Sequence, residues 1–242
     1  MLVPLYEPKP ERKMRVVVLF SGGASAVPFM LGSESYEVVG AVSSNPNASG
    51  IERLKSLEIP VEVLDIREFY GEKPLTDMER RREYDLRLAE LVSRWRPDVV
   101  ACSGYMYILT QVFLTSFPNR VLNVHPADLR IMEGGRRKYA GLHVVEKQLR
   151  CGEKFTRSTV HLMSEDVDHG PIVCVSAPLP FEGRTPQEQQ ELMKQRCDGP
   201  AYRKALQLIS EGDIALDENM EVHHRRGEKW IRGPYVMVSE WE

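Results

Sequence analysis

The sequence predicts an α/β protein with a doubly wound, mostly parallel sheet and helices on both faces of that sheet. Short runs rich in Val, Ile and Leu alternate along the chain with longer segments of helical spacing, and this alternation is typical of consecutive βαβ units. The first run, residues 14–20, is rich in β-branched apolar residues, as strands buried within a parallel sheet are. Residues 156–179 differ, because polar and apolar residues alternate before a tight connection. An antiparallel strand is expected there.

Composition excludes several classes of protein. Of 242 residues, 42% are hydrophobic and 28% are charged, and the net charge of −3 does not suit a general nucleic-acid binder. No apolar run approaches the length of a membrane span, and the first residues do not resemble a signal peptide. The four cysteines lack CxxC spacing, so reduced thiols are expected. We therefore expect a cytoplasmic protein that binds neither nucleic acid nor membranes.

The chain divides into three parts. Residues 1–13 are expected to form an irregular arm, because three prolines interrupt a charged stretch. Residues 14–215 are expected to form a single domain, without a linker or repeat that would split it. Residues 216–242 form a carboxyl-terminal extension that carries no functional signal.

Within the domain, apolar runs predict the strands and helical spacing predicts the helices. Ser49 and the Thr185-Pro186 pair are typical helix starts, and Gly212 is a typical helix end. Strands are expected at 14–20, 36–44, 59–66, 97–109 (running into a loop), 121–126, 156–163 and 171–179. Helices are expected from Ala24 onward and at 49–59, 76–95, 110–117, 141–150 and 185–212, the last of them disturbed at Gly199-Pro200.

The segment VLNVHP, residues 121–126, is the strongest candidate for a site. The strand period of two places Asn123 and His125 on one face, and Pro126 ends the strand there. An amide can donate to an oxyanion while an imidazole moves a proton near neutral pH. The pair could equally be a polar cap on a strand end.

A second candidate is the glycine turn after the first strand, formed by Gly22, Gly23, Ala24 and Ser25. A strand, a glycine turn and a helix amino terminus together favour an anion, although a plain strand–helix turn fits equally. Arg81 belongs to a run of three arginines on the 76–95 helix. Such runs usually lie on solvated faces, but an arginine facing the glycine turn could hold a phosphate.

Two later loops remain. The connection 164–170 contains Glu165, Asp166, Asp168 and His169; these are ordinary turn residues without a second ligand pair, so no metal is expected. The basic loop 134–138 is either a solvated insertion or a loop that covers a site.

The order of these motifs carries a resemblance. VVVLFSGGAS, PDVVACSGYMYIL, VLNVHP, YAGLH and STVHLMSEDVDHGPIV together resemble the folate-dependent formyltransferase family over about residues 14–215, and most closely its phosphoribosylglycinamide formyltransferase branch. The resemblance implies a Rossmann-like fold and transfer of a formyl group from 10-formyltetrahydrofolate, as co-substrate, to a primary amine. Asn123, His125 and Asp168 fall on the family's catalytic positions.

The same resemblance implies the binding residues. The folate pocket falls on Met106, Tyr107, Leu109, Met163 and Asp166. The phosphate site of a ribonucleotide acceptor falls on Gly22, Gly23, Ala24, Ser25 and Arg81, and Asp198 falls where the family contacts a ribose. A phosphorylated small-molecule amine is therefore the expected acceptor, and a homodimer is a possible assembly.

The chain departs from the family pattern in the acceptor region. The family's phosphate loop usually reads GxGSN, whereas this chain has Ala24 and Ala26 in place of a glycine and an asparagine. The segment after VLNVHP is longer by the GGRRK region, and Arg136, Arg137 and Lys138 are expected to fold over the phosphate. Glycinamide ribonucleotide, in purine biosynthesis, is the expected acceptor. The alternatives are another amine, such as an amino sugar nucleotide, or a non-enzymatic nucleotide-binding protein.

Overall fold

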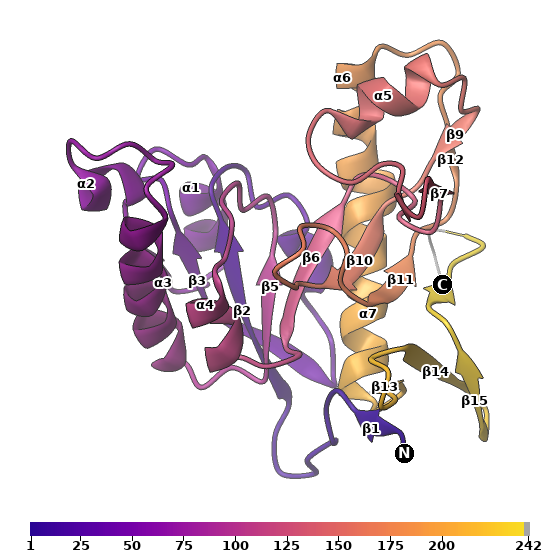
Figure 1. The fold of residues 1–242 in the computed structure, drawn as a ribbon. Helices are drawn as coiled ribbons and strands as arrows, with labels where there is room; N and C mark the ends of the chain where they lie inside the picture. The colour runs from indigo at the N-terminus through magenta and orange to yellow at the C-terminus, as the bar shows by residue number, and fades with distance from the viewer. Residues whose placement is uncertain (240–242) are drawn as a thin grey trace.

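The computed structural model, which describes residues 1–239, is built around an eight-stranded sheet (Figure 1). All neighbouring strands are parallel except at β10, which runs antiparallel to both of its neighbours. The predicted sheet and its antiparallel strand are thus confirmed. In spatial order the strands are β16 (Tyr235–Val236), β11 (Ile172–Val175), β10 (Thr159–Leu162), β6 (Val121–His125), β5 (Val99–Cys102), β2 (Met14–Phe20), β3 (Tyr36–Ser43) and β4 (Val61–Val63).

Helices cover both faces of the sheet, and alternate side chains of each central strand point to opposite faces. In β2, Val16, Val18 and Phe20 pack into one core, whereas Val17 and Leu19 pack into the other. The first core, the α7 face, is covered by α1 (Gly50–Ser56), the 3-10 helix η1 (Val27–Met30) and α7 (Gly199–Ser210). The second, the α3 face, is covered by α2 (Ile66–Tyr70), α3 (Met78–Ser93) and α4 (Gln111–Ser116).

A smaller lobe stands beside the sheet. It contains α5 (Val144–Arg150), α6 (Pro186–Met193) and the two-stranded pair of β9 (Phe155–Thr156) with β12 (Leu179–Pro180), and it has a small core of its own. Thr185 and Glu188 form a capping box that starts α6. Another short hairpin pairs β7 (Met132–Glu133) with β8 (Arg136–Arg137).

The predicted 185–212 helix is interrupted in a way that the sequence did not specify. The chain passes from α6 into a π-helical turn, η2 (Lys194–Asp198), and then into α7. Gly199 is required where α7 begins, because a Cβ at that position would lie 2.2 Å from the ring of Phe29. The Gly199-Pro200 step therefore marks a close approach to the residues after the glycine turn, and not a helix end.

The two terminal segments pair with each other. β1 (Val3–Pro4), β13 (Ile214–Leu216), β14 (Val222–Arg226) and β15 (Lys229–Arg232) form a second, antiparallel sheet, and β16 then joins the edge of the main sheet. The arm is therefore not wholly irregular, since it pairs with β13, and the extension joins the main sheet through β16. The last residues of the predicted 216–242 extension, 240–242, lie outside the described part. Within residues 1–239, no helix is long and apolar enough to cross a membrane.

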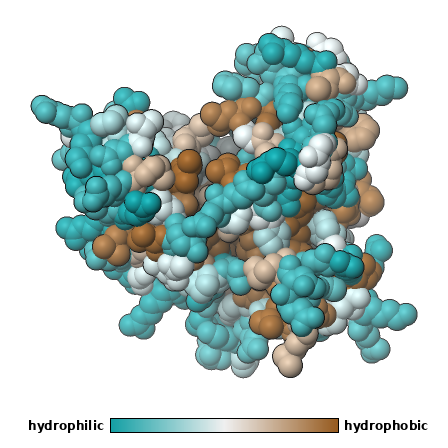
Figure 2. Space-filling view, viewed as in Figure 1, coloured by the Kyte–Doolittle hydropathy of each residue, from teal (hydrophilic) through white to brown (hydrophobic). Residues whose placement is uncertain are grey.

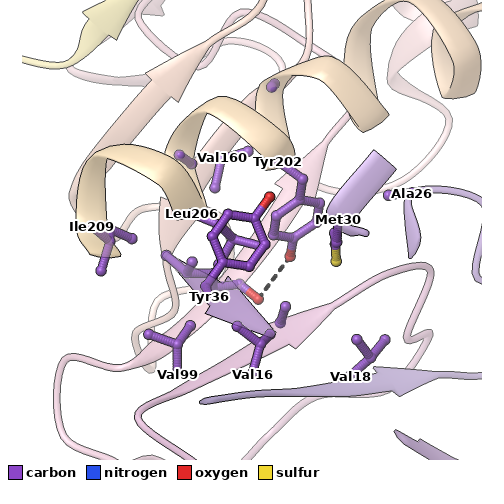
Figure 3. Close-up of a cluster of buried hydrophobic side chains, with 14 of the residues drawn as sticks. Val16, Val18, Ala26, Met30, Tyr36, Val99, Val160, Tyr202, Leu206 and Ile209 are labelled. Atoms are coloured by element: carbon purple, nitrogen blue, oxygen red, sulfur yellow. Dashed lines mark hydrogen bonds between the residues drawn. The ribbon is translucent and has the colours of Figure 1, made fainter. Parts of the chain in front are cut away.

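Tyr202 fastens α7 to the centre of the sheet (Figure 3). Its side chain is fully buried, and its hydroxyl lies 2.7 Å from the carbonyl oxygen of Cys102 in β5 and 3.1 Å from that of Leu122 in β6. One phenol thus ties the helix to two adjacent strands, the second of which carries Asn123 and His125.

We expect Tyr202→Phe to lower the free energy of unfolding by about 1–2 kcal/mol, the usual cost of deleting a buried hydrogen bond. Urea denaturation followed by circular dichroism measures it. Arg203→Ala, an exposed position on the same helix, is the control and should change stability by less than about 0.5 kcal/mol. Equal effects of the two substitutions would show that the phenol does not fasten the helix.

Candidate active site

Strand β6 presents Asn123 and His125 on the face of the sheet opposite α7. Leu122 and Val124 pack toward α7, so the residues between and after them point to the other side. The antiparallel register places His161 of β10 directly opposite Asn123. Three polar side chains from two adjacent strands therefore gather on one face.

His125 is held through both of its ring nitrogens. Its side chain is buried, Nε2 lies 2.7 Å from the carbonyl oxygen of Tyr139, and Nδ1 lies 3.3 Å from Oδ2 of Asp168. Because a carbonyl only accepts, Nε2 must carry a hydrogen. The proton that the ring can gain or lose is therefore the one on Nδ1, which faces the carboxylate.

Asp168 comes from the connection between β10 and β11, which turns back over the face of these strands. Its side chain is 9% exposed, and its backbone is left-handed, with φ of +57°. Oδ2 also accepts a hydrogen bond of 2.9 Å from the amide of Gly141, and Oδ1 lies 3.5 Å from Nε2 of His161. The carboxylate thus lies between two imidazoles.

His161 is a member of this cluster that the sequence analysis missed. Its Nδ1 donates to the carbonyl of Leu162 at 2.9 Å, and its Nε2 lies 3.4 Å from Nδ2 of Asn123. It links the amide to the carboxylate. The STVHLM alternation placed His161 on one face of a strand, but only the register with β6 shows that this face is shared with Asn123.

Burial and charge act in opposite directions within the cluster. Burial lowers the pKa of His125, and the neighbouring His161 ring and Arg137 guanidinium lower it further, whereas the charge of Asp168 opposes them. Burial would raise the pKa of Asp168, but the hydrogen bond with His161, the charge of His125 and the Gly141 amide together lower it to about 2. The site therefore contains an ionised carboxylate beside an imidazole that titrates below its ordinary range.

The glycine turn differs from the expected helix amino terminus. Only the 3-10 helix Val27–Met30 follows it, so little helix dipole is directed at the turn. Ala24 adopts a left-handed φ of +48° at the position where the family usually has a glycine. Ser21 accepts a hydrogen bond from the amide of Met106, and Ser103 accepts one from the amide of Ala26. The turn is thus joined to the loop after β5.

Arg81 does not face the glycine turn. It is 4% exposed, and its guanidinium lies 5.2 Å and 5.0 Å from the ring centroids of Tyr70 and Tyr107. These rings belong to the α3 face, whereas Ala24 packs on the α7 face. Nη1 of Arg81 is buried without a hydrogen-bond partner. The structure therefore groups Arg81 with the loop containing Tyr107 and not with the turn.

Most of the expected folate-pocket residues also gather on the α3 face. Leu109 is buried in its core, and Tyr107 and Met163 pack against that core. Met106 is 67% exposed, and Asp166 lies on the surface. Figure 2 shows the surface hollowed between the part of the molecule formed by α2 and α3 and the lobe of α5 and α6, with hydrophobic residues inside the hollow.

The remaining predicted residues are Asp198 and the basic loop 136–138, which lie in different parts of the structure. Asp198 accepts a hydrogen bond of 2.5 Å from Ser158, next to the residue opposite His125, and burial raises its pKa to about 6 despite that bond. The expectation that the basic loop lies over the glycine turn is not met. Arg136 pairs with Asp166, Arg137 binds the backbone of the 164–170 turn, and Lys138 pairs with Glu133.

Comparison with known proteins places this geometry in a family. The family model of formyl transferases matches residues 14–203. The chain belongs to the formyl transferase family. The match spans the main sheet from β2 to β11 and the first turn of α7, and it therefore contains Asn123, His125, His161 and Asp168.

Individual formyl transferases are similar over most of the chain. The phosphoribosylglycinamide formyltransferase of Escherichia coli is 26% identical over 211 residues, which are 85% of this chain and 92% of that protein. The trifunctional purine biosynthetic protein adenosine-3 of Drosophila melanogaster is 29% identical over 216 residues, but the match spans only 14% of its length. The solved glycinamide ribonucleotide transformylase 1 of Symbiobacterium toebii has a TM-score of 0.76 at 27% identity, covering 88% of this chain and 95% of that one.

We expect Asp168→Asn to lower the pKa of His125 further, because burial then acts on the imidazole without an opposing negative charge. Titration of the His125 ring signals by NMR measures the shift. Asp166→Asn is the control, since Asp166 lies on the surface, paired with Arg136, and should leave the pKa of His125 unchanged. An unchanged or raised value in Asp168→Asn would contradict the assigned interaction.

Proposed function

We propose that this chain transfers a formyl group from 10-formyltetrahydrofolate to a primary amine, and that the amine is glycinamide ribonucleotide, a substrate of purine biosynthesis. One observation carries the proposal: in a chain of the formyl transferase family, Asp168 lies 3.3 Å from His125 and 3.5 Å from His161, which in turn contacts Asn123. The names of its relatives support the choice of acceptor.

The reaction creates two charges that this cluster can balance. Attack of the amine on the formyl carbon makes a tetrahedral oxyanion and a cationic nitrogen. The Nδ2 group of Asn123 can donate to the oxyanion once substrate replaces its weak contact with His161. His125, when protonated on Nδ1, adds a positive charge to the same site and provides a proton for transfer.

Asp168 would then set the protonation state of His125. The bond from Nε2 to the Tyr139 carbonyl fixes the ring orientation, so the titrating Nδ1 always faces the carboxylate. With a pKa near 2, Asp168 remains ionised at physiological pH. It can accept a proton transiently, directly or through a water, on its path from the amine to N10 of the leaving folate.

The acceptor would lie on the glycine-turn side of the cluster. Backbone donors at Gly22–Ser25 need no particular side chain to bind a phosphate, and this supports an anion there even with Ala24 and Ala26 in place of the usual residues. Asp198, near the carboxyl end of β6, is our candidate for the ribose hydroxyls. The altered turn also favours testing an amino sugar nucleotide as acceptor.

The folate would lie on the α3 side, against Tyr107, Leu109 and Met163, with Met106 and Asp166 at the margin. We assign Arg81 to this side. Its buried guanidinium next to Tyr107 has an unpartnered Nη1, and this favours a carboxylate partner. Folate provides such carboxylates at its glutamate end.

No metal is required by this scheme, since proton transfer and oxyanion stabilisation are both assigned to side chains. Among the described residues, no group of His, Cys, Asp or Glu side chains is arranged to bind a metal ion. We also propose a cytoplasmic enzyme without nucleic-acid or membrane partners, consistent with Cys102, Cys151, Cys174 and Cys197 forming no disulfide. Light scattering of the purified protein tests whether it is a homodimer.

The deciding experiment incubates the protein with 10-formyltetrahydrofolate and each candidate amine while tetrahydrofolate release is monitored. Release that depends on glycinamide ribonucleotide is expected. Turnover only with an amino sugar nucleotide would correct the acceptor, and no turnover with any amine would favour a nucleotide-binding protein without this activity.

We expect His125→Ala to reduce kcat by about 10²–10⁴-fold, the range for loss of an acid–base group, while the Kd for folate stays close to the parental value. Asn123→Ala should cost about 10²–10³-fold, as loss of an oxyanion donor does. Steady-state kinetics and folate binding measure the two effects. His223→Ala, in the terminal sheet, is the control and should keep parental kcat; if His125→Ala did the same, His125 would have no part in the mechanism.

A further inference from the structure

The hairpin β7–β8 belongs to the segment by which this chain is longer than the family pattern. Met132 pairs with Arg137 and Glu133 with Arg136, and the two connecting residues, Gly134 and Gly135, have φ of +59° and +81°. Two left-handed residues make a tight hairpin turn whose twist matches the strands. The position of Arg137 is thereby fixed by backbone geometry.

Arg137 binds the turn that carries Asp168 at three successive residues. Its Nη1 donates to the carbonyl oxygen of Asp168 at 2.5 Å, and its Nη2 donates to that of Gly170 at 2.8 Å. Its backbone amide lies 3.4 Å from Nε2 of His169, the residue between them. A planar guanidinium with two carbonyl partners restrains both distance and orientation.

The turn needs this restraint. Asp168 occupies the left-handed region, which residues with a side chain adopt less readily than glycine. An open groove of about 470 Å³ lies at the surface between the turn and the carboxyl-terminal extension; it is lined by Arg137, His169 and Pro171 on one side and by residues 219–222 and 232–234 on the other. Because the turn borders this groove, the hydrogen bonds from Arg137 are among the contacts that restrain its backbone on that side.

The arrangement favours support of the turn over contact with substrate. Both terminal nitrogens of Arg137 are already bound to carbonyl oxygens, and the side chain is only partly exposed. Arg136, by contrast, is 66% exposed and pairs with the exposed Asp166. Exposed ion pairs of this kind contribute little to stability. The two adjacent arginines therefore have separable roles.

We propose that Arg137 is a positioning residue that holds the 168–170 backbone so that the Asp168 carboxylate stays between His125 and His161. The proposal rests on the proposed function and deepens it, because the hairpin would make the catalytic carboxylate of this chain dependent on a segment that the family pattern lacks. Displacement of a reacting group by about 1 Å can reduce a rate about 10²-fold.

The test compares Arg137→Ala with Arg136→Ala in the full chain. Arg137→Ala is expected to lower kcat about 10–100-fold with KM for both substrates within about threefold, as expected when a positioned group is lost and binding is kept. Hydrogen exchange of the amides in 166–170 should accelerate, and millimolar guanidinium should restore part of kcat. Arg136→Ala should keep kcat within about twofold.

A parental kcat in Arg137→Ala, or a loss confined to the KM of the acceptor, would overturn the proposal. Should Arg137→Ala fail to fold, Arg137→Lys keeps the charge but cannot reproduce the paired donors; an unchanged kcat there would equally reject it. If the parental protein formylates no amine, the proposed function fails. Unchanged hydrogen exchange of the 166–170 amides in Arg137→Ala would, independently of activity, reject Arg137 as the positioning residue.

Discussion

The carboxylate of Asp168 is the group on which the rest of the site depends. It is a nearly buried negative charge, and such a charge is tolerated only when donors surround it. Here the Gly141 amide donates to the carboxylate, the ring of His161 lies beside it, and Nδ1 of His125 donates to it when that ring is protonated. Each donor comes from a different segment, so β6, β10 and the loop after β6 must all be in register before the charge is stable. The alignment of these three segments, which stabilises the buried carboxylate, also brings the side chains of the candidate site together.

The antiparallel strand β10 is what makes this arrangement possible. If β10 and β11 ran parallel to each other, the chain between them would need a long crossover connection, usually through a helix, instead of a short turn. Because β10 runs antiparallel to β6, His161 lies directly opposite Asn123, and the short connection to β11 can return over both strands. The one exception to a parallel sheet thus provides both an imidazole and the turn with the carboxylate.

The sequence was informative where the governing interactions are local. The period of a strand is enough to place Asn123 and His125 on one side, and the fold class follows from alternation of elements. His161 was missed because cross-strand register is a tertiary property. The resemblance assigns Arg81 to the phosphate site, and the sequence predicts its helix but not the sheet face that the helix covers. The partners of Arg136 and Arg137 lie about thirty residues away in the chain, and spacing within GGRRK gives no information about them.

This chain departs from the family pattern at the glycine turn and at the β7–β8 hairpin. The two departures contact different parts of the site, so we expect them to have different effects. Ala24 and Ala26 alter the glycine turn, which joins the loop after β5 through Ser21 and Ser103. The added hairpin is bound instead to the turn of Asp168, through Arg137. A change in acceptor preference is therefore expected to arise from the glycine turn and its neighbours. On our proposal the hairpin would instead affect the rate, because Asp168, which it holds, would take part in the chemical step for any amine.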